Sequence, residues 1–326
     1  MRIAVIAALL GPVTAYAQGV DRRYVEEPTA GMALPTTPLA GEHDARAVVA
    51  NPGGLALIRG RELALALDVE DPDVATHAGQ GFGAFWAQSI GGRILPRLGL
   101  GVGLEWLRPS RSRLEPDPGQ PFRLTLGLAA PLGGSAGLGA AWHHFQADGA
   151  LSGADTIDLG LSLRLGNHVA VGAVLRDLAT SDIAGTPVGR RYEAELALRP
   201  LGTGTLDAGF GGRISETRGD VDGWVRASLR VARGVYVHGE VETRALHVLD
   251  DTTVGIDDHR GRDLRATLGL ELSLGAFGAT TLATALRDDA GKTHALGGTA
   301  ILRLSSAGPR SALGTPDHIE RVELSG

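Results

Sequence analysis

The sequence predicts an all-β protein, a 14-stranded antiparallel transmembrane β-barrel with a short N-terminal hatch. Three observations predict this fold class. Every second side chain is apolar in fourteen successive segments between residues 62 and 304, long and short connections alternate between these segments, and Gly supplies 48 of the 326 residues. Because each Gly inside a helix costs about 1 kcal/mol relative to Ala, the composition disfavours a bundle of long helices.

The first element is a predicted signal peptide over residues 1–17. Met1-Arg2 is a charged start, residues 3–10 are apolar, and Ala15-Tyr16-Ala17 is an A-x-A cleavage site. The chain has no Cys, which excludes disulfides and Cys-ligated metal sites. A net charge of −6 argues against a nucleic-acid partner. These features predict export, through the signal peptide, to the outer membrane of a Gram-negative-type cell.

The strands follow from a period of two. Successive side chains of a strand point to opposite faces, so one face of each segment is apolar and the other is small, polar or charged. The pattern predicts strands at residues 62–70, 81–90, 98–107, 121–130, 136–147, 155–165, 169–178, 191–200, 205–216, 222–231, 235–249, 263–274, 278–287 and 293–304.

The connections favour a barrel. Long polar loops are predicted at residues 71–80, 108–120, 179–190 and 250–262, and tight turns at 131–135, 166–168, 232–234 and 275–277. Short turns at one end and longer loops at the other are typical of outer-membrane barrels. The alternative is a soluble β-sandwich, which also alternates but is usually richer in β-branched and aromatic side chains.

Aromatic side chains should gather where a barrel wall meets the two membrane surfaces. The predicted membrane-interface aromatics beside the long loops are Trp106, Phe122, Trp142 and Tyr192. Tyr236 and Phe277, near short turns, are expected to form a thin second girdle. The expected partners of such a wall are outer-membrane lipid, lipopolysaccharide and the barrel-assembly machinery.

Charged residues on the polar face of the strands should line the lumen. They are Arg123, Arg164, Arg176, Glu193, Glu195, Arg213, Arg226, Glu240, Arg265 and Glu271. Their signs are mixed, so many should pair across neighbouring strands. Two readings stay open: a charged pore lining that selects solutes, or a mesh of ion pairs that fills the barrel.

Residues 18–61 lack the period-two pattern and are predicted to form a hatch ahead of the barrel at residues 62–304. In this segment Asp44-Ala45 and a short apolar spacer precede Asn51-Pro52-Gly53-Gly54-Leu55-Ala56. The motif resembles the start of the FadL-type long-chain fatty-acid transporter superfamily. The resemblance implies fourteen strands, a hatch in the lumen, and a hatch or gating role for Asn51, Pro52, Gly53 and Gly54.

The residues themselves agree with such a role. Pro52 restricts Asn51 to an extended or turn conformation, and Gly53-Gly54 is expected to permit a sharp reversal into the first wall strand.

The predicted barrel wall and the resemblance to the FadL-type superfamily together predict a protein that passes or gates small hydrophobic solutes. The alternative is a plugged structural barrel that assists secretion or anchors a periplasmic module. Residues 305–326 fit an anchor, because a Ser-, Gly- and Pro-containing linker leads into Ile319-x-x-Val322-x-Leu324, which resembles the first strand of periplasmic signal-peptide peptidases. Any peptidase domain would lie beyond Gly326.

No catalytic residue, cofactor or metal site is predicted within these residues. His143 and His144 are adjacent, so on a strand they point to opposite faces, and an interfacial polar pair is their expected role. Asp250, Asp251, Asp257, Asp258 and Asp263 are predicted to form a solvated acidic loop, with a divalent-cation site as the alternative.

Overall fold

The structure is a computed structural model. It describes residues 22–25, 28–71, 80–91, 97–108, 114–115, 119–179, 183, 188–216, 219–252 and 255–306. The predicted signal peptide and residues 307–326 of the predicted C-terminal segment lie outside the described residues. Within the described ranges, no helix is both long enough and apolar enough to cross a bilayer.

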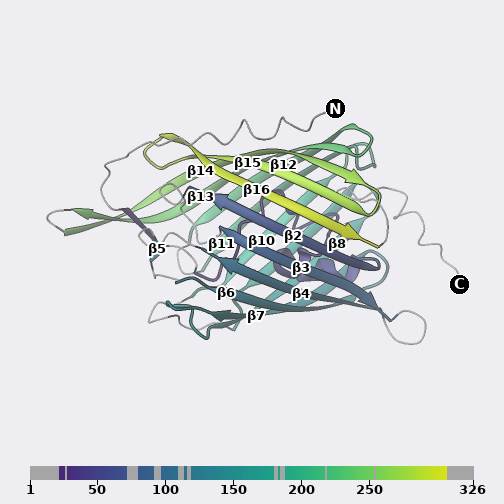
Figure 1. The fold of residues 1–326 in the computed structure, drawn as a ribbon, viewed down its shortest axis with the longest axis horizontal. Helices are drawn as coiled ribbons and strands as arrows, with labels where there is room; N and C mark the ends of the chain where they lie inside the picture. The colour runs from purple at the N-terminus through teal and green to yellow at the C-terminus, as the bar shows by residue number, and fades with distance from the viewer. Residues whose placement is uncertain are drawn as a thin grey trace, which may run out of the picture.

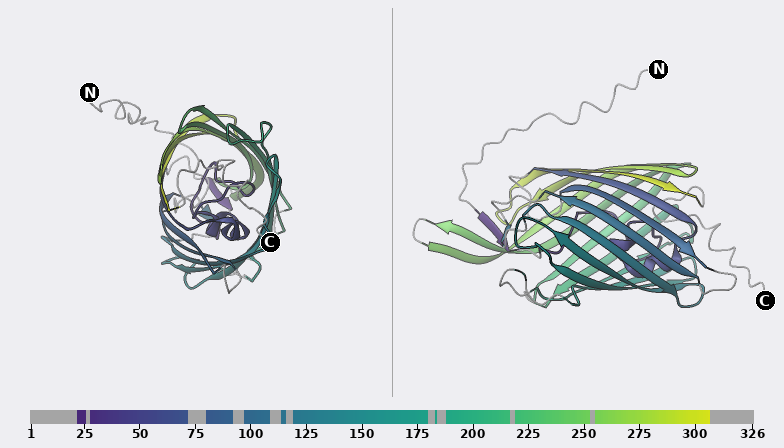
Figure 2. Two further views of the ribbon diagram at one scale, coloured as in Figure 1. Left: turned by 90° about the vertical axis from the view of Figure 1, so that its right-hand side faces the viewer. Right: turned by 60° about the horizontal axis from the view of Figure 1, so that its bottom comes forward.

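Fourteen strands form the wall of a closed antiparallel barrel (Figures 1 and 2). Each wall strand pairs with its neighbours in chain order, β16 returns to pair with β2, and β12 pairs with β13. The wall strands are β2 (Arg61–Glu70), β3 (Gly81–Ile90), β4 (Leu98–Leu107), β6 (Phe122–Pro131), β7 (Ala136–Gln146), β8 (Asp155–Leu165), β9 (Val169–Arg176), β10 (Arg191–Leu198), β11 (Leu206–Ser215), β12 (Val221–Ala232), β13 (Val235–Thr252), β14 (Gly255–Leu274), β15 (Phe277–Arg287) and β16 (Thr293–Ser305). The predicted fold class is confirmed.

Predicted and observed strand ends agree within two residues everywhere except in one hairpin. β13 and β14 pair without a break from Val235–Leu272 to Thr252–Gly255, so the predicted loop at residues 250–262 is wrong. Each strand satisfies the backbone hydrogen bonds of the other, so the acidic composition of this segment does not end the pairing. Asp263 is not a loop residue either, because it lies buried on β14.

Four short elements are not wall strands. The strand β1 (Arg22–Val25) pairs antiparallel with β13 at residues 247–250, and β5 (Leu114–Glu115) pairs parallel with β1. The helix α1 (Ala47–Ala50) and the 3₁₀ helix η1 (Pro52–Leu57) lie inside the barrel, as the end-on view in Figure 2 shows.

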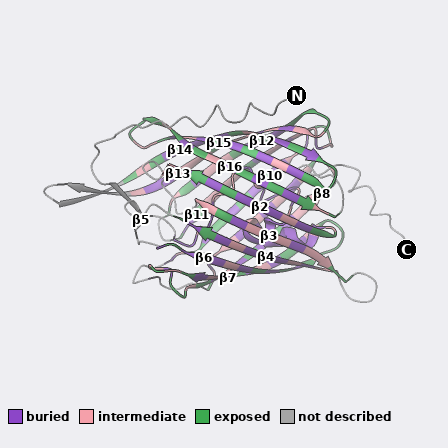
Figure 3. Ribbon diagram, in the orientation of Figure 1, coloured by how far each residue is buried: buried purple, intermediate pink, exposed green. Residues whose placement is uncertain are grey.

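The wall is apolar outside and polar inside. On β14, Leu268 is 64% exposed and Leu270 53%, whereas Thr267 and Glu271 are buried. Figure 3 shows this alternation of buried and exposed positions along the wall strands. An outward apolar band is the arrangement of a barrel whose wall contacts lipid.

The two ends of the barrel differ in their connections. We call the end with the turns at residues 132–135, 166–168, 233–234 and 275–276 the short-turn end, and the opposite end the long-loop end. The β13–β14 hairpin projects beyond the wall at the long-loop end (Figure 1). We call residues 28–58, which lie in the lumen, the plug.

Candidate functional site: the lumen and its plug

The plug crosses the lumen from the long-loop end to the short-turn end. Near the long-loop end, the amide of Met32 donates to Glu105 Oε1 (3.0 Å), and Arg123 Nη1 donates to the carbonyl of Thr29 (3.2 Å). At the short-turn end, Arg97 Nη2 donates to the carbonyl of Ile58 (2.5 Å). The chain then enters the wall at the first residue of β2.

The side chain of Asn51 joins the plug to the wall. Asn51 is fully buried and extended (φ −149°, ψ 98°). Its Nδ2 donates to the carbonyls of Leu39 (2.7 Å) and Leu161 (2.9 Å), and its Oδ1 accepts from the amide of Gly53 (3.1 Å). One amide side chain therefore connects two parts of the plug with strand β8.

Gly53 and Gly54 are required by close packing rather than by a reversal. Both lie in η1 rather than in a left-handed turn, so the expected sharp reversal is wrong. A Cβ on Gly53 would come within 2.6 Å of the carbonyl oxygen of Gly160, and a Cβ on Gly54 within 2.4 Å of the ring of His43. At Gly53 the plug backbone therefore lies directly on the wall backbone, and at Gly54 it lies against the His43 ring.

Glycines of the wall form the other half of this contact. A Cβ on Gly137 would come within 2.3 Å of the carbonyl oxygen of Gly53, and a Cβ on Gly139 within 2.3 Å of that of Pro52. The same close approach to the plug occurs at Gly99, Gly101, Gly127, Gly160 and Gly172. We call these seven wall residues the glycine seat. Seven of the 48 Gly residues therefore make room for the plug.

Apolar side chains complete the seat. Val48 and Leu55 of the plug pack with Phe85 and Ile301 of the wall in one buried cluster. The largest buried hydrophobic cluster among the described residues therefore joins the plug to the wall inside the lumen.

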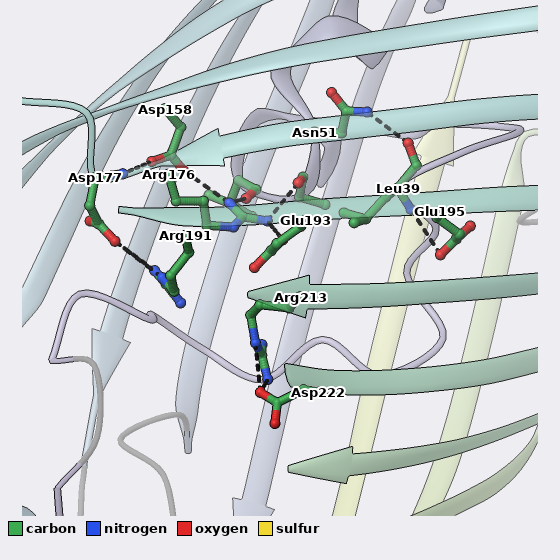
Figure 4. A network of polar contacts seen from close by, with 12 residues as sticks. Leu39, Asn51, Asp158, Arg176, Asp177, Arg191, Glu193, Glu195, Arg213 and Asp222 are labelled. Atoms are coloured by element: carbon green, nitrogen blue, oxygen red, sulfur yellow. Dashed lines mark hydrogen bonds and ion pairs between the residues drawn. The ribbon is translucent and has the colours of Figure 1, made fainter. Parts of the chain in front are cut away.

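Arg176 caps the C-terminus of α1. Its Nη1 donates to the carbonyl of Val49 (2.9 Å) and its Nη2 to that of Ala50 (2.8 Å), while Asp158 and Glu193 hold the guanidinium at 2.9 and 2.8 Å. Figure 4 shows this network. A cation at the end of a helix is favourable because the last carbonyls carry partial negative charge.

Glu195 and Arg226 hold the middle of the plug. Glu195 accepts from the amides of Leu39 (3.5 Å) and Ala40 (3.3 Å), and Arg226 Nη2 donates to the carbonyl of Ala40 (3.1 Å). The two side chains also pair with each other at 2.6 Å, and Arg226 pairs with Asp207 at 3.0 Å.

The structure places all ten predicted lumenal charges inside the barrel. Arg164 donates to the carbonyl of Gly41 (3.0 Å), and Glu240 accepts from the amide of Thr36 (2.8 Å). Two further arginines pair within the wall, Arg213 with Asp222 at 2.6 Å and Arg265 with Glu70 at 2.5 Å. Glu271 pairs with His238 and Arg303. The arrangement is a mesh of ion pairs that also binds the plug, and buried charges require such pairing.

The sequence reading missed several partners of this mesh, namely Glu70, Glu105, Asp158, Asp222 and His238. On their strands these residues alternate with the apolar outer-face residues, as the ten predicted charges do. This alternation could have identified them. His143 was expected at a membrane interface, but it is buried in the lumen, where its imidazole contacts Thr125 (2.8 Å) and Asp158 (3.1 Å). His144 points to the other face and contacts Asp155.

The aromatic side chains lie mainly outside. Trp106, Trp142 and Tyr192 are exposed on the outer face near the long-loop end, and the rings of Trp106 and Phe122 are 5.2 Å apart. Tyr236 is buried and does not belong to a second girdle, because it stands at the lumenal parity of β13.

Two titratable groups of the plug have shifted pKa values. Burial lowers the pKa of His43 to about 4, with Arg164 adding to the shift, and the imidazole contacts Ser162 Oγ at 2.9 Å. Burial alone would raise the pKa of Asp44, but its ion pair with Arg46 holds that pKa well below its usual range. At neutral pH the plug therefore carries an uncharged His43 and an ionised Asp44.

Two cavities adjoin the plug. One of about 200 Å³ lies between plug residues 30–39 and the wall, with Met32 and Leu34 on one side and Arg191 and Arg213 on the other. A second, of about 20 Å³, lies at the short-turn end. Among the described residues, no group of three or more His, Asp and Glu side chains is placed to hold a metal ion.

Neither a protein-family model nor a curated protein matches the sequence. Solved structures do match the fold. A Pseudomonas aeruginosa FadL homologue superposes with a TM-score of 0.53 at 10% identity, covering 86% of this chain and 97% of that one. This chain has the fold of a FadL-type outer-membrane barrel. The CymD monoaromatic hydrocarbon channel gives a TM-score of 0.49 at 11% identity, covering 81% of this chain and 93% of the channel.

Proposed function

We propose that this FadL-type barrel passes small hydrophobic solutes across the outer membrane and that the plug controls their passage. The cavity of about 200 Å³ is the observation that carries the proposal. Its plug side is apolar at Met32, Leu34 and Val49, and its wall side is charged. Small-molecule sites combine apolar surface with fixed polar groups, and this cavity has both, with nine charged side chains among its lining residues.

The size of the cavity favours small solutes. Sites for drug-sized ligands usually measure about 300–1,000 Å³, and this cavity measures about 200 Å³. A solute of roughly the size of a single aromatic ring with a short side chain fits the space better than an extended long acyl chain does.

The placement in a membrane is supported by the outer surface of the wall. Apolar side chains form a continuous exposed band, and the exposed Trp106, Trp142 and Tyr192 stand at one edge of it. Such a surface would contact lipid along the band and lipopolysaccharide at the long-loop end.

A structural barrel is the second candidate, and the tight seating of the plug favours it. The plug backbone lies against the glycine seat, and Asn51 ties it to β8. If the plug never moves, the protein conducts nothing and serves as an anchor or a secretion component.

Reconstitution separates the two candidates. The full chain and a variant without residues 18–50 would be placed in liposomes, and single-channel conductance and uptake of benzoate, octanoate and palmitate would be measured. We expect the deletion to raise conductance, and we expect benzoate and octanoate to enter faster than palmitate. Heat-modifiable migration in detergent gels would confirm that the barrel is folded. Absence of flux from both folded proteins would contradict transport and support the structural barrel.

A further inference from the structure

Plug residues 39–42 separate the two cavities. Leu39 lines the larger cavity, and Gly41 and Glu42 line the smaller one. We propose that Leu39–Glu42 is the gate of the lumen, and that solutes pass it along strands β9 to β12 toward the short-turn end. This inference rests on the proposed transport function and assigns its path and its moving part.

The register of β10 places the gate between the cavities. From the long-loop end, the lumenal side chains of β10 are Arg191, Glu193, Glu195 and Ala197. The first two line the larger cavity and Ala197 lines the smaller one. Glu195 is the lumenal residue between these positions, and it accepts hydrogen bonds from the amides of Leu39 and Ala40.

Two wall glycines leave room for the side chains of Arg226 and Trp224 to reach the gate. A Cβ on Gly209 would come within 2.7 Å of Arg226 Nε, and a Cβ on Gly211 within 2.1 Å of the Trp224 ring. Arg226 reaches the carbonyl of Ala40 (3.1 Å), and Trp224 Nε1 donates to Glu195 (3.0 Å). The wall is built so that these two side chains lie across the lumen at the level of the gate.

The gate is held differently from the rest of the plug. The segment around η1 lies in the glycine seat with a large apolar cluster beneath it. At the gate, the buried apolar cluster is limited to Ala40, Ala170 and Ala197, and a single seat glycine, Gly172, approaches the backbone of Leu39 and Ala40. The polar contacts are hydrogen bonds with plug backbone, in which Glu195 accepts from the amide of Ala40, Arg226 and Arg164 donate to the carbonyls of Ala40 and Gly41, and Asn51 donates to that of Leu39. Such bonds can be exchanged for bonds to water or solute, so this segment can shift while η1 stays in place.

A reversible cross-link tests the gate directly. The Cβ position of residue 41 lies 3.8 Å from Ala197 Cβ, close to the separation in a disulfide, about 3.8 Å. The chain has no Cys of its own, so a Gly41→Cys/Ala197→Cys variant carries a single pair. We expect oxidation to lower solute uptake at least about fivefold and reductant to restore it. Gly41 has φ +96°, so the single Gly41→Cys variant measures the effect of strain alone.

A pair of isosteric substitutions tests the hydrogen bonds. Glu195→Gln weakens the hold on the amides of Leu39 and Ala40, and we expect conductance to rise about tenfold, since hydrogen bonds to a charged group are the stronger kind. Asp222→Asn is the matched control, because Asp222 is also a buried lumenal carboxylate paired with an arginine, and its described contacts are with Arg213 and the amide of Ala245. An equal rise in both variants would show general loosening of the wall and overturn the gate.

The outcomes separate the gate from transport itself. If the folded variant without residues 18–50 passes no solute, the proposed function fails. If that variant passes solute but a verified disulfide between positions 41 and 197 leaves uptake by the full chain unchanged, transport stands and the path runs elsewhere, which overturns the gate.

Discussion

Asn51 Nδ2 lies 2.7 Å from the carbonyl oxygen of Leu39 and 2.9 Å from that of Leu161. The amide therefore ties the first residue of the proposed gate to the carbonyl of a wall strand. Asn51 also begins η1, which occupies the glycine seat. The fixed and the movable parts of the plug meet at this one buried side chain.

Replacement of Asn51 by Ala should release the plug without unfolding the barrel. The carbonyls of Leu39 and Leu161 would lose this donor, and a buried group without its partner costs about 1–3 kcal/mol. In detergent solution, we expect proteinase K to cleave within residues 28–58 faster than in the unaltered protein, as measured by mass spectrometry of the fragments. Asn167→Ala, in the β8–β9 turn, is the control and should leave the plug resistant. Equal cleavage in both variants would contradict the role of Asn51.

Gly160→Ala should displace the plug by overpacking. A Cβ at this position would come within 2.3 Å of Asn51 Oδ1 and 2.8 Å of the amide nitrogen of Gly53. Overpacking of a close contact typically costs about 1–3 kcal/mol, so conductance should increase while heat-modifiable migration is kept. Gly239→Ala is the matched control on another wall strand, because its Cβ would have no neighbour closer than 3.9 Å. Unchanged conductance of Gly160→Ala would show that the seat tolerates a methyl group.

Period two predicted the wall because a barrel strand separates two environments. The alternation that puts Leu268 on the outer face puts its neighbour Thr267 in the lumen. The same alternation on other strands correctly predicted that Arg176 and Glu193 face the lumen. It could not predict that Arg176 binds the carbonyls of Val49 and Ala50, because the plug has no period of its own and its path depends on packing.

The motif at the start of η1 shows the same limit. Its resemblance placed Asn51 to Gly54 in a hatch, and the rule that Pro restricts the preceding residue agrees with the extended Asn51. The predicted reason for Gly54, a sharp reversal, was wrong, however, since the ring of His43 is what leaves no room for a side chain there. That contact joins residues eleven positions apart in a non-repetitive segment, and no local rule reports it.

Acid should loosen the plug through His43. Burial lowers the pKa of His43 to about 4 from 6.5, so between these values a released plug binds a proton that the seated plug does not. Stability of the seated plug therefore falls as pH drops from 6.5 toward 4, by up to about 3 kcal/mol. Arg164 opposes protonation, and Glu42, Asp44 and Glu195 favour it.

Conductance measured between pH 7.5 and 4.5 checks this effect and should rise with acid. His43→Gln, which can still contact Ser162, should remove the rise. His144→Gln, at an exposed histidine on the outer face, should retain it. The lowered pKa of Asp44 acts only below its ordinary value of 3.8 and so does not contribute in this range. A pH response that survives His43→Gln would assign it to another group.

The register of β1 on β13 predicts that this pairing holds the start of the plug at the long-loop end, and we call the pairing the strap. Tyr24 pairs with Val248, in the part of the β13–β14 hairpin that projects beyond β12 and β15. Since the plug begins just after β1, this pairing should limit how far the plug can withdraw toward the short-turn end. A Tyr24→Cys/Val248→Cys variant should form a disulfide on mild oxidation, because directly paired positions of antiparallel strands lie about 4.5–5.5 Å apart. Tyr24→Cys/Leu249→Cys is the control and should cross-link poorly, because a shift of one residue places the second side chain on the opposite face. Equal cross-linking of the two pairs would show that β1 does not hold this register, and the strap would then be absent.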